Sequence, residues 1–331
     1  MQGKVTLEDH FAIAETLNPP TGFTPEVWAE LKPRLLDILE LRLPAMDASG
    51  VEMMIVSLNS PAVQAIHDVR LAVETARRAN DFLAEQVQKR PDRFAAVAAL
   101  PMQDPEAAAI ELQRCVRDLG FRGALVNGYS QVGSPDKAVY LDLPIYRPFW
   151  GMVESLGLPF YLHPRNPMAN QPVSFDGHPW LLGATWGFHA ETAVHALRLI
   201  GSGLFDVYPR LSIVLGHLGE GLPFYLWRID NRNKWMNKPH KYTAKRTVAD
   251  YLRTNFHVTT SGHYSTPALL DTIAELGSDR VMFSVDYPFE AIDDATAWFD
   301  TVPISEADRL KIGRTNAIKL FKLEMKSGRS L

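Results

Sequence analysis

Short runs of apolar and β-branched residues alternate along the chain with longer segments in which apolar residues recur at helical spacing. Runs of about four to eight such residues are typical of buried strands, and longer periodic segments are typical of amphipathic helices. We expect eight strands, at residues 4–8, 52–58, 94–100, 123–126, 159–162, 211–216, 256–260 and 280–285. We expect helices at residues 35–49, 66–89, 105–119, 145–156, 192–203, 222–234, 267–276 and 306–322.

This alternation of strand and helix predicts βαβ units and a parallel sheet. Eight such units in 331 residues fit an α/β fold, one closed (β/α)8 TIM barrel, with residues 1–331 as a single domain. An open doubly wound sheet is disfavoured because no GxGxxG motif follows an early strand. Segments 11–33 and 164–185 are rich in Pro, Asn and Gly, so we expect long loops there, the first as an insertion after the first strand.

Composition narrows the range of partners. The net charge is −4 and Lys and Arg are scattered singly, so neither nucleic acid nor an acidic membrane is an expected partner. A small molecule is the expected substrate. Cys115 is the only cysteine, so any metal must be held by His and carboxylate ligands. The N-terminal residues show no signal-peptide pattern and no apolar run reaches the ~18 residues of a membrane span, so we expect a cytoplasmic protein.

Five polar residues stand where predicted strands end. Glu8 and His10 lie two apart, so the alternation of a strand points both side chains to one face. His163, His217 and Asp286 end the fifth, sixth and eighth strands. Each alone has an ordinary explanation, as a solvated strand end, a loop contact or a helix cap. Together they fall at the carboxyl ends of barrel strands, where this fold builds active sites, and their types suit Zn²⁺ or Mn²⁺.

The order of these residues resembles the amidohydrolase superfamily, over nearly the whole chain. Many hydrolases of that superfamily carry His-x-His on the first strand, whereas this chain has Glu8-Asp9-His10. Residues 123–127 also contain no lysine that could bridge a second metal. Both differences look like the decarboxylase branch that includes aminocarboxymuconate-semialdehyde decarboxylase.

Four motifs within that branch look most like the γ-resorcylate (2,6-dihydroxybenzoate) decarboxylases. The motifs are Gly3-Lys-Val-Thr-Leu-Glu-Asp-His-Phe, His163-Pro-Arg-Asn-Pro, Gly216-His-Leu-Gly-Glu and Ser284-Val-Asp-Tyr-Pro-Phe. His10 favours this group, because the related 2,3-dihydroxybenzoate and salicylate decarboxylases often have alanine at its position.

The resemblance implies one divalent ion per subunit, Zn²⁺ or Mn²⁺, and no organic cofactor. The implied ligands are Glu8, His10, His163 and Asp286. It also implies reversible, non-oxidative decarboxylation of 2,6-dihydroxybenzoate to resorcinol and CO2, with the ion bound to the substrate carboxylate and phenolate. Asp286 is expected to protonate the ring carbon, using a proton that the bound substrate releases. His217 and Glu220 are expected to polarise the site and to help move that proton.

Aromatic residues near the expected mouth of the barrel are candidates to hold a benzene ring, although each alone is more often part of a core. These are Phe23, Phe188 and Phe289. His189 follows Phe188 and is expected to line the pocket without touching the metal. Arg228 matches an arginine that family members contribute to a neighbouring subunit's site, which implies a homodimer or tetramer. Its ordinary explanation is a surface ion pair.

Three other functions remain open. A decarboxylase of 2,3-dihydroxybenzoate or salicylate would share the ligands and the fold. A metal-dependent hydrolase of a small lactone, amide or ester could use the same ligands, with Asp286 as the base. A non-catalytic barrel could bind a metal or an aromatic ligand as a sensor.

Overall fold

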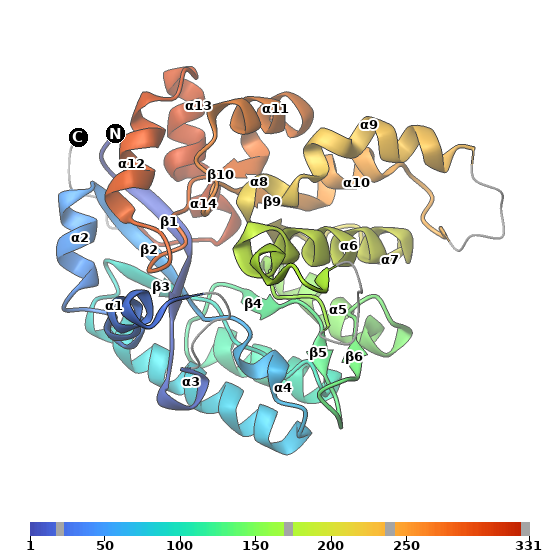
Figure 1. The fold of residues 1–331 in the computed structure, drawn as a ribbon, viewed down its shortest axis with the longest axis horizontal. Coiled ribbons are helices and arrows are strands. Elements are labelled where there is room, and N and C mark those ends of the chain that lie inside the picture. The colour runs from blue at the N-terminus through green and yellow to red at the C-terminus, as the bar shows by residue number, and fades with distance from the viewer. Residues whose placement is uncertain (18–22, 169–174, 236–241, 326–331) are drawn as a thin grey trace.

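Eight parallel strands form the centre of the computed structural model, which describes residues 1–17, 23–168, 175–235 and 242–325 (Figure 1). They are β1 (Lys4–Phe11), β2 (Val51–Leu58), β3 (Phe94–Ala96), β4 (Ala124–Asn127), β7 (Phe160–His163), β8 (Ile213–Leu215), β9 (Phe256–Thr259) and β10 (Val281–Met282). All eight lie where the hydrophobic pattern predicts a strand.

The strands follow the order of a closed barrel. Strands β1 to β3 pair in one parallel sheet, and β4, β7, β8, β9 and β10 pair in a second. A parallel bridge between Ala98 and Ala124 connects the two sheets on one side. On the other side the backbone N–H of His10 donates a 2.6 Å hydrogen bond to the carbonyl of Tyr287, just after β10. The predicted (β/α)8 barrel is confirmed.

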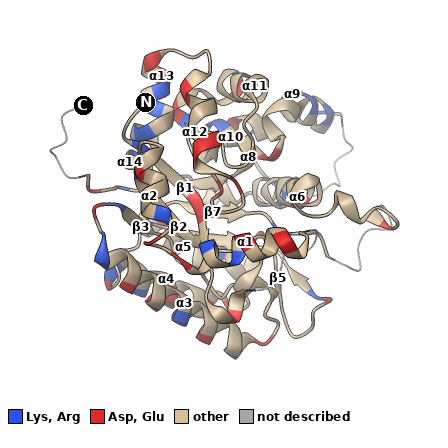
Figure 2. Ribbon diagram, turned by 60° about the vertical axis from the view of Figure 1, so that its left-hand side comes forward, with Lys and Arg blue, Asp and Glu red and all other residues tan. Residues whose placement is uncertain are grey.

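Helices connect successive strands and surround the barrel. The described helices are α1 (Pro25–Leu36), α2 (Arg42–Ala48), α3 (Val69–Lys89), α4 (Pro105–Arg117), α5 (Arg147–Leu156), α6 (Gly187–Gly201), α7 (Leu204–Val207), α8 (His217–Glu220), α9 (Leu222–Asn233), α10 (Val248–Asn255), α11 (Thr266–Leu276), α12 (Ile292–Thr301), α13 (Glu306–Leu310) and α14 (Asn316–Leu320). Lys, Arg, Asp and Glu are interspersed along α3 and α4 (Figure 2), as scattered charges in the sequence predict. Among the described residues, none of the helices combines the length and hydrophobicity needed to cross a lipid bilayer.

The structure differs from the predicted elements in several places. Segment 11–33 contains α1, which begins after Thr24, whose hydroxyl accepts a hydrogen bond from the backbone N–H of Val27. Thr24 followed by Pro25 is a helix-start signal that outweighs the polar composition of the segment. The hydrophobic pattern also missed α10, α12 and the short hairpin of β5 (Ser130–Gln131) with β6 (Ala138–Val139). The helix predicted at 306–322 is interrupted by a π-helical turn at Lys311–Thr315.

Two apolar cores lie on the two faces of the strands. The outer core packs the strands against the surrounding helices. The inner core fills the barrel with side chains that include Val5, Leu7, Tyr161 and Met282. At the amino-terminal end of the barrel, Phe321 and Leu323 pack against this core. That end of the barrel is therefore closed by the chain that follows α14.

A bulge in β1 changes which side chains face the barrel interior. Val5 and Leu7 belong to the inner core, so plain alternation would send Glu8 outward. The register against β2 shifts between Thr6 and Asp9, and Glu8 adopts a left-handed conformation with φ 64°. Such a bulge inserts one extra residue and re-aims the side chains that follow. Leu7, Glu8 and His10 can then all face the interior.

Candidate metal centre

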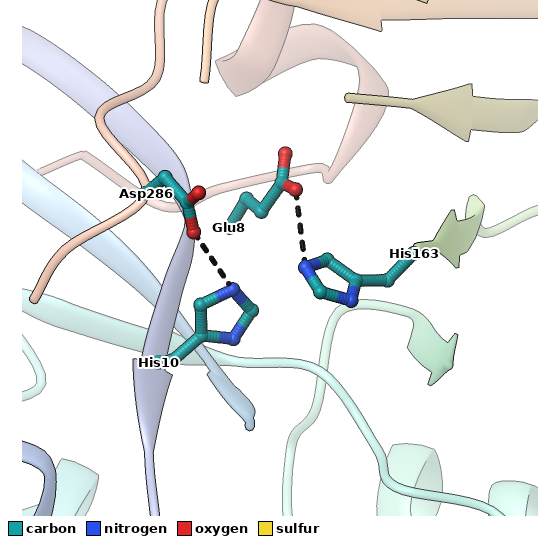
Figure 3. A group of neighbouring side chains, drawn as sticks. All are labelled: Glu8, His10, His163 and Asp286. Atoms are coloured by element: carbon teal, nitrogen blue, oxygen red, sulfur yellow. Dashed lines mark ion pairs between the residues drawn. The ribbon is translucent and has the colours of Figure 1, made fainter. Parts of the chain in front are cut away.

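Four polar side chains from three strand ends meet at the carboxyl-terminal end of the barrel (Figure 3). Glu8, His10, His163 and Asp286 each offer a ligand atom, and these atoms all lie within 4.8 Å of one another. His10 Nε2 lies 3.1 Å from Asp286 Oδ1, and His163 Nε2 lies 3.2 Å from Glu8 Oε1. The residues singled out from the sequence as a ligand set are therefore brought together by the fold.

The chemistry of these atoms fits a divalent cation. Glu8 Oε1 and His10 Nε2 are buried and make no hydrogen bond within the described residues. A buried polar atom without a partner is costly, and a metal ion would satisfy both atoms at once. The hydroxyl of Ser57 lies 3.2 Å from His10 Nδ1, which orients the imidazole so that Nε2 points into the group. Nitrogen and oxygen donors of this kind suit Zn²⁺ or Mn²⁺.

Glu8 is the most enclosed member of the group. Its carboxylate is buried, and burial alone would raise its pKa, but the charges of His217, His163 and His10 together hold that pKa well below its usual range. Gly216 makes this position possible, because a Cβ there would lie 2.8 Å from both carboxylate oxygens. Glu8 is consequently ionised, and it lies against Gly216 at the end of β8.

His217 sits on a left-handed turn beside the four ligands. The five residues from His217 to Gly221 all have positive φ, an arrangement that costs roughly 1–2 kcal/mol for each non-glycine residue. The turn places His217 Nε2 3.7 Å from Glu8 Oε1 and 3.7 Å from Asp286 Oδ2, while Nδ1 lies 2.8 Å from Glu220 Oε1. Burial alone would lower the pKa of His217, but Glu220, Glu8 and Asp286 raise it well above its ordinary value.

Comparison with known proteins places this arrangement in a family. Residues 14–323 match the amidohydrolase family. This chain belongs to the amidohydrolase family. The match begins just after Glu8 and His10, so the first two candidate ligands lie outside it.

Several relatives of this amidohydrolase are decarboxylases. A gamma-resorcylate decarboxylase of Rhizobium sp. (strain MTP-10005) is 63% identical over 325 residues, which cover 98% of this chain and 99% of that protein. A crystal structure of a 2,6-dihydroxybenzoate decarboxylase complexed with 2,6-dihydroxybenzoate is 64% identical, with a TM-score of 0.95 over 98% of this chain and all (100%) of that one. A dihydroxybenzoic acid decarboxylase from Polaromonas sp. JS666, solved with bound manganese and the inhibitor 2-nitroresorcinol, is 60% identical, with a TM-score of 0.95 over 98% of each chain.

Two phenylalanines of the amidohydrolase, both candidates from the sequence, lie near the ligand His10. The rings of Phe23 and Phe289 are stacked with centroids 6.1 Å apart, and the Phe289 ring lies 5.8 Å from the His10 ring. Phe188 lies half-buried in the first turn of α6, and its carbonyl accepts a hydrogen bond from the Thr192 hydroxyl. Its contact with a substrate stays a prediction.

A cavity of about 500 Å³ has Glu220, the partner of His217, in its lining. It is lined by Trp186, His189, Tyr225 and Arg228 among others, and by none of the four candidate metal ligands. His189 therefore lines a cavity that includes Glu220 but none of the four candidate ligands, and its place in the substrate pocket stays a prediction. Arg228 is exposed on α9 in the single subunit.

Sequence reasoning overlooked a buried arginine that connects the ligand-bearing segments. Arg42 on α2 is fully buried, donates a 2.6 Å hydrogen bond to the carbonyl of His10, and stacks 4.7 Å from the ring of Tyr287. It thus holds the segments that carry His10 and Asp286 against each other. Asp9 lies buried nearby, and burial raises its pKa to about 7. No local pattern in residues 35–49 distinguishes Arg42 from a surface arginine.

Proposed function

We propose that this amidohydrolase catalyses the reversible, non-oxidative decarboxylation of 2,6-dihydroxybenzoate to resorcinol and CO2. The observation that carries the proposal is the four-residue group itself, at the closed junction of β1, β7 and the segment after β10, in a chain over 60% identical to decarboxylases of this substrate. A barrel that only senses a ligand would have no need of a second histidine, His217, whose Nε2 lies 3.7 Å from Asp286 Oδ2 beside the four ligands.

Glu8, His10, His163 and Asp286 would hold one divalent ion, Zn²⁺ or Mn²⁺. When bound, the ion supplies a Lewis acid that binds the substrate carboxylate and the adjacent phenolate oxygen. The stacked rings of Phe23 and Phe289 lie where they can orient a benzene ring over His10. No organic cofactor is required by this reaction.

Asp286 is the acid in this proposal. The phenol loses its proton on binding, and His217 with Glu220 conducts a proton to the Asp286 carboxylate. Asp286 then protonates the ring carbon that bears the carboxylate. The bond between that carbon and the carboxylate breaks, its electron pair restores the aromatic ring, and CO2 leaves. Resorcinol takes its phenolic proton from solvent.

The decisive experiment loads the purified protein with Mn²⁺ or Zn²⁺, adds 2,6-dihydroxybenzoate, and measures resorcinol by chromatography and CO2 in the headspace. We expect equal amounts of both products, and none after the metal is removed with a chelator. Parallel reactions with 2,3-dihydroxybenzoate, salicylate and a small lactone distinguish the alternative substrates. Faster turnover of the lactone would replace the proposal with a hydrolase.

We further propose that the enzyme is a homo-oligomer, a dimer or a tetramer, in which α9 is an interface. Phe224 and Trp227 on α9 are each 74% exposed, and Tyr225 is 50% exposed beside the equally exposed Trp186 at the cavity. A gathering of large apolar side chains on one surface is typical of a protein interface. Trp227→Glu is expected to lower the mass measured by light scattering. Ile110→Glu, at an exposed apolar residue of α4, is the control that should leave the mass unchanged.

Arg228 lies on the same helix, and we propose that it serves the active site of a neighbouring subunit. Co-expression of Asp286→Asn with Arg228→Ala tests this assignment. If Arg228 acts across the interface, mixed oligomers contain sites with a native Asp286 and a native Arg228, and activity returns. If Arg228 acts within its own subunit, the mixture stays as inactive as its parents.

A further inference from the structure

Three hydroxyl groups converge on one oxygen of Glu8. Tyr161 and Ser261 donate hydrogen bonds to Glu8 Oε2, and the hydroxyl of Thr259 lies 3.2 Å from the same atom. The three groups also contact one another, with Thr259 Oγ1 2.9 Å from the Tyr161 hydroxyl and 2.8 Å from Ser261 Oγ. All three residues are buried, at 2% exposure or less. We call Tyr161, Thr259 and Ser261 the hydroxyl cluster.

The other oxygen of Glu8 has a different environment. Glu8 Oε1 accepts no hydrogen bond within the described residues, and the Nε2 atoms of His163 and His217 lie 3.2 Å and 3.7 Å from it. A carboxylate oxygen has about two lone-pair sites, so Oε2 is already filled by its hydroxyl donors. Only Oε1 is left to bind a cation.

The cluster comes from two strands, one of which also carries a candidate ligand. Tyr161 lies two residues before His163 on β7, so both side chains face the barrel interior. Thr259 ends β9, and Ser261 follows it by two residues. Strand geometry thus fixes the distance between the hydroxyls and the place where a metal would sit.

We propose that the hydroxyl cluster positions Glu8 so that it binds the metal through Oε1 alone. This assignment rests on the proposed metal site, where a Glu8 that binds through one oxygen would leave more room on the ion for the substrate oxygens. A Glu8 that turned to bind through both oxygens would occupy one of those positions. Tyr161, Thr259 and Ser261 are positioning residues, because they act through Glu8 and touch no reacting atom.

The hydroxyl cluster could instead do no more than neutralise the cost of burying a carboxylate. The two roles differ in what happens to the metal when hydroxyls are removed. If the cluster restrains Glu8, the freed Oε2 turns to the metal and displaces one bound water. If the cluster only solvates Glu8, the number of bound waters does not change.

The experiment counts the water molecules on Mn²⁺ in the substrate-free protein, from the broadening of its electron paramagnetic resonance spectrum in ¹⁷O-water. The variants are Ser261→Ala and the double variant Tyr161→Phe with Ser261→Ala. We expect the double variant to hold one water fewer than the native protein, and Ser261→Ala to show a mixture of the two counts. An unchanged count in both variants overturns the proposal, whatever happens to activity.

Thr260→Val is the matched control. Thr260 is equally buried and adjacent in the chain, but its hydroxyl donates to the carbonyl of Ser284 rather than to Glu8. It should leave the water count at the native value, and thermal unfolding shows whether each variant is folded. If the double variant does not fold, the water count of Ser261→Ala alone tests the proposal, and an unchanged count overturns it. Binding of Mn²⁺ does not require turnover. Native protein that binds Mn²⁺ but fails to decarboxylate 2,6-dihydroxybenzoate refutes the proposed function, and its water count still tests the hydroxyl cluster. Native protein that fails to bind Mn²⁺ overturns both the proposed function and the role of the cluster.

Discussion

The two carboxylates of the candidate metal centre are built in opposite ways. The Glu8 side chain is fully enclosed, with one oxygen surrounded by the hydroxyl cluster and the other facing His163. The Asp286 side chain is 16% exposed, and its oxygens face His10 and His217. Both residues have positive φ, so each is held by a strained backbone.

This difference matches the roles proposed for the two residues, in which Glu8 is a ligand alone and Asp286 is both a ligand and the acid. A carboxylate that accepts several hydrogen bonds and faces cationic groups stays ionised and fixed. The Asp286 carboxylate is partly open to solvent and lies 3.7 Å from His217 Nε2, so a substrate bound at this end of the barrel can reach it. Two residues of nearly the same chemistry are therefore suited to different tasks by what surrounds them.

The largest expected effect is that of Asp286→Asn. An amide cannot deliver the proton, so turnover should fall roughly 10²–10⁴-fold, and further if the metal is bound more weakly. Steady-state rates of resorcinol formation, measured with saturating Mn²⁺, test this expectation. Recovery of native turnover at high Mn²⁺ would mean that Asp286 is only a ligand. Glu8 and Asp286 would then have the same role.

Glu8→Gln should also lose activity, but because it binds the metal more weakly and not because a proton donor is missing. Residues that merely support a metal ligand change affinity by about 10–100-fold, so loss of the ligand charge should weaken Mn²⁺ binding by at least about 100-fold. Calorimetric titration of the metal-free protein with Mn²⁺ gives the affinity. Activity should return in part as Mn²⁺ is raised, and a variant that binds Mn²⁺ normally yet stays inactive would assign Glu8 a chemical role.

Asp9, the neighbour of Glu8 on β1, should make the free energy of unfolding depend on pH. Burial raises the pKa of Asp9 to about 7 from 3.8, so the folded protein retains a proton that the unfolded chain loses. The contribution of Asp9 to the free energy of unfolding is therefore complete below pH 3.8 and falls by about 1.4 kcal/mol per pH unit as the pH rises toward 7.

Asp9→Asn removes this titration and can still accept the 3.2 Å hydrogen bond from the N–H of Tyr287. The gain in thermal midpoint over the native metal-free protein should grow between pH 5 and about 7 and then level off. Parallel curves for the two proteins across this range would show that Asp9 is ionised in the fold.

The smallest effect is expected at the mouth beside Asp286. Phe23→Ala removes the ring that stacks on Phe289, an interaction of about 0.5–1.5 kcal/mol, so KM for 2,6-dihydroxybenzoate should rise roughly 2- to 10-fold with little change in kcat. Phe23→Tyr keeps the stacked ring and should behave like the native enzyme. A change in kcat alone for Phe23→Ala would remove Phe23 from substrate binding.

Much of this site could be anticipated because its residues end strands with a clear hydrophobic pattern. Glu8 and His10 are close in sequence, and His163 and Asp286 each follow an apolar run, so the barrel topology alone brings them together. The bulge at Glu8 was not predictable, since plain alternation also places Glu8 and His10 on one face. The inner-core positions of Val5 and Leu7 and the shifted register against β2 reveal the bulge only in the structure.

Residues that act through long-range contacts were missed. Arg42 reaches His10 and Tyr287 from a different helix, and nothing near it in the sequence indicates that it is buried. Tyr161 did carry a signal, because it lies two residues before His163 on the same strand. Within the left-handed turn at His217, only Gly219 and Gly221 indicated a positive φ from the sequence. The positive φ of the non-glycine residues depends on the packing around them, which the sequence does not show.

The closed lower end of the barrel governs how molecules reach the centre. Phe321 and Leu323 seal the amino-terminal end, and the inner core occupies the space beneath Glu8. We therefore expect substrate and products to enter and leave at the carboxyl-terminal end, beside Phe23 and Phe289. Because both products pass the same end of the barrel, we expect CO2 and resorcinol to leave in a fixed order. We expect them to bind in the reverse order when the reaction runs toward carboxylation.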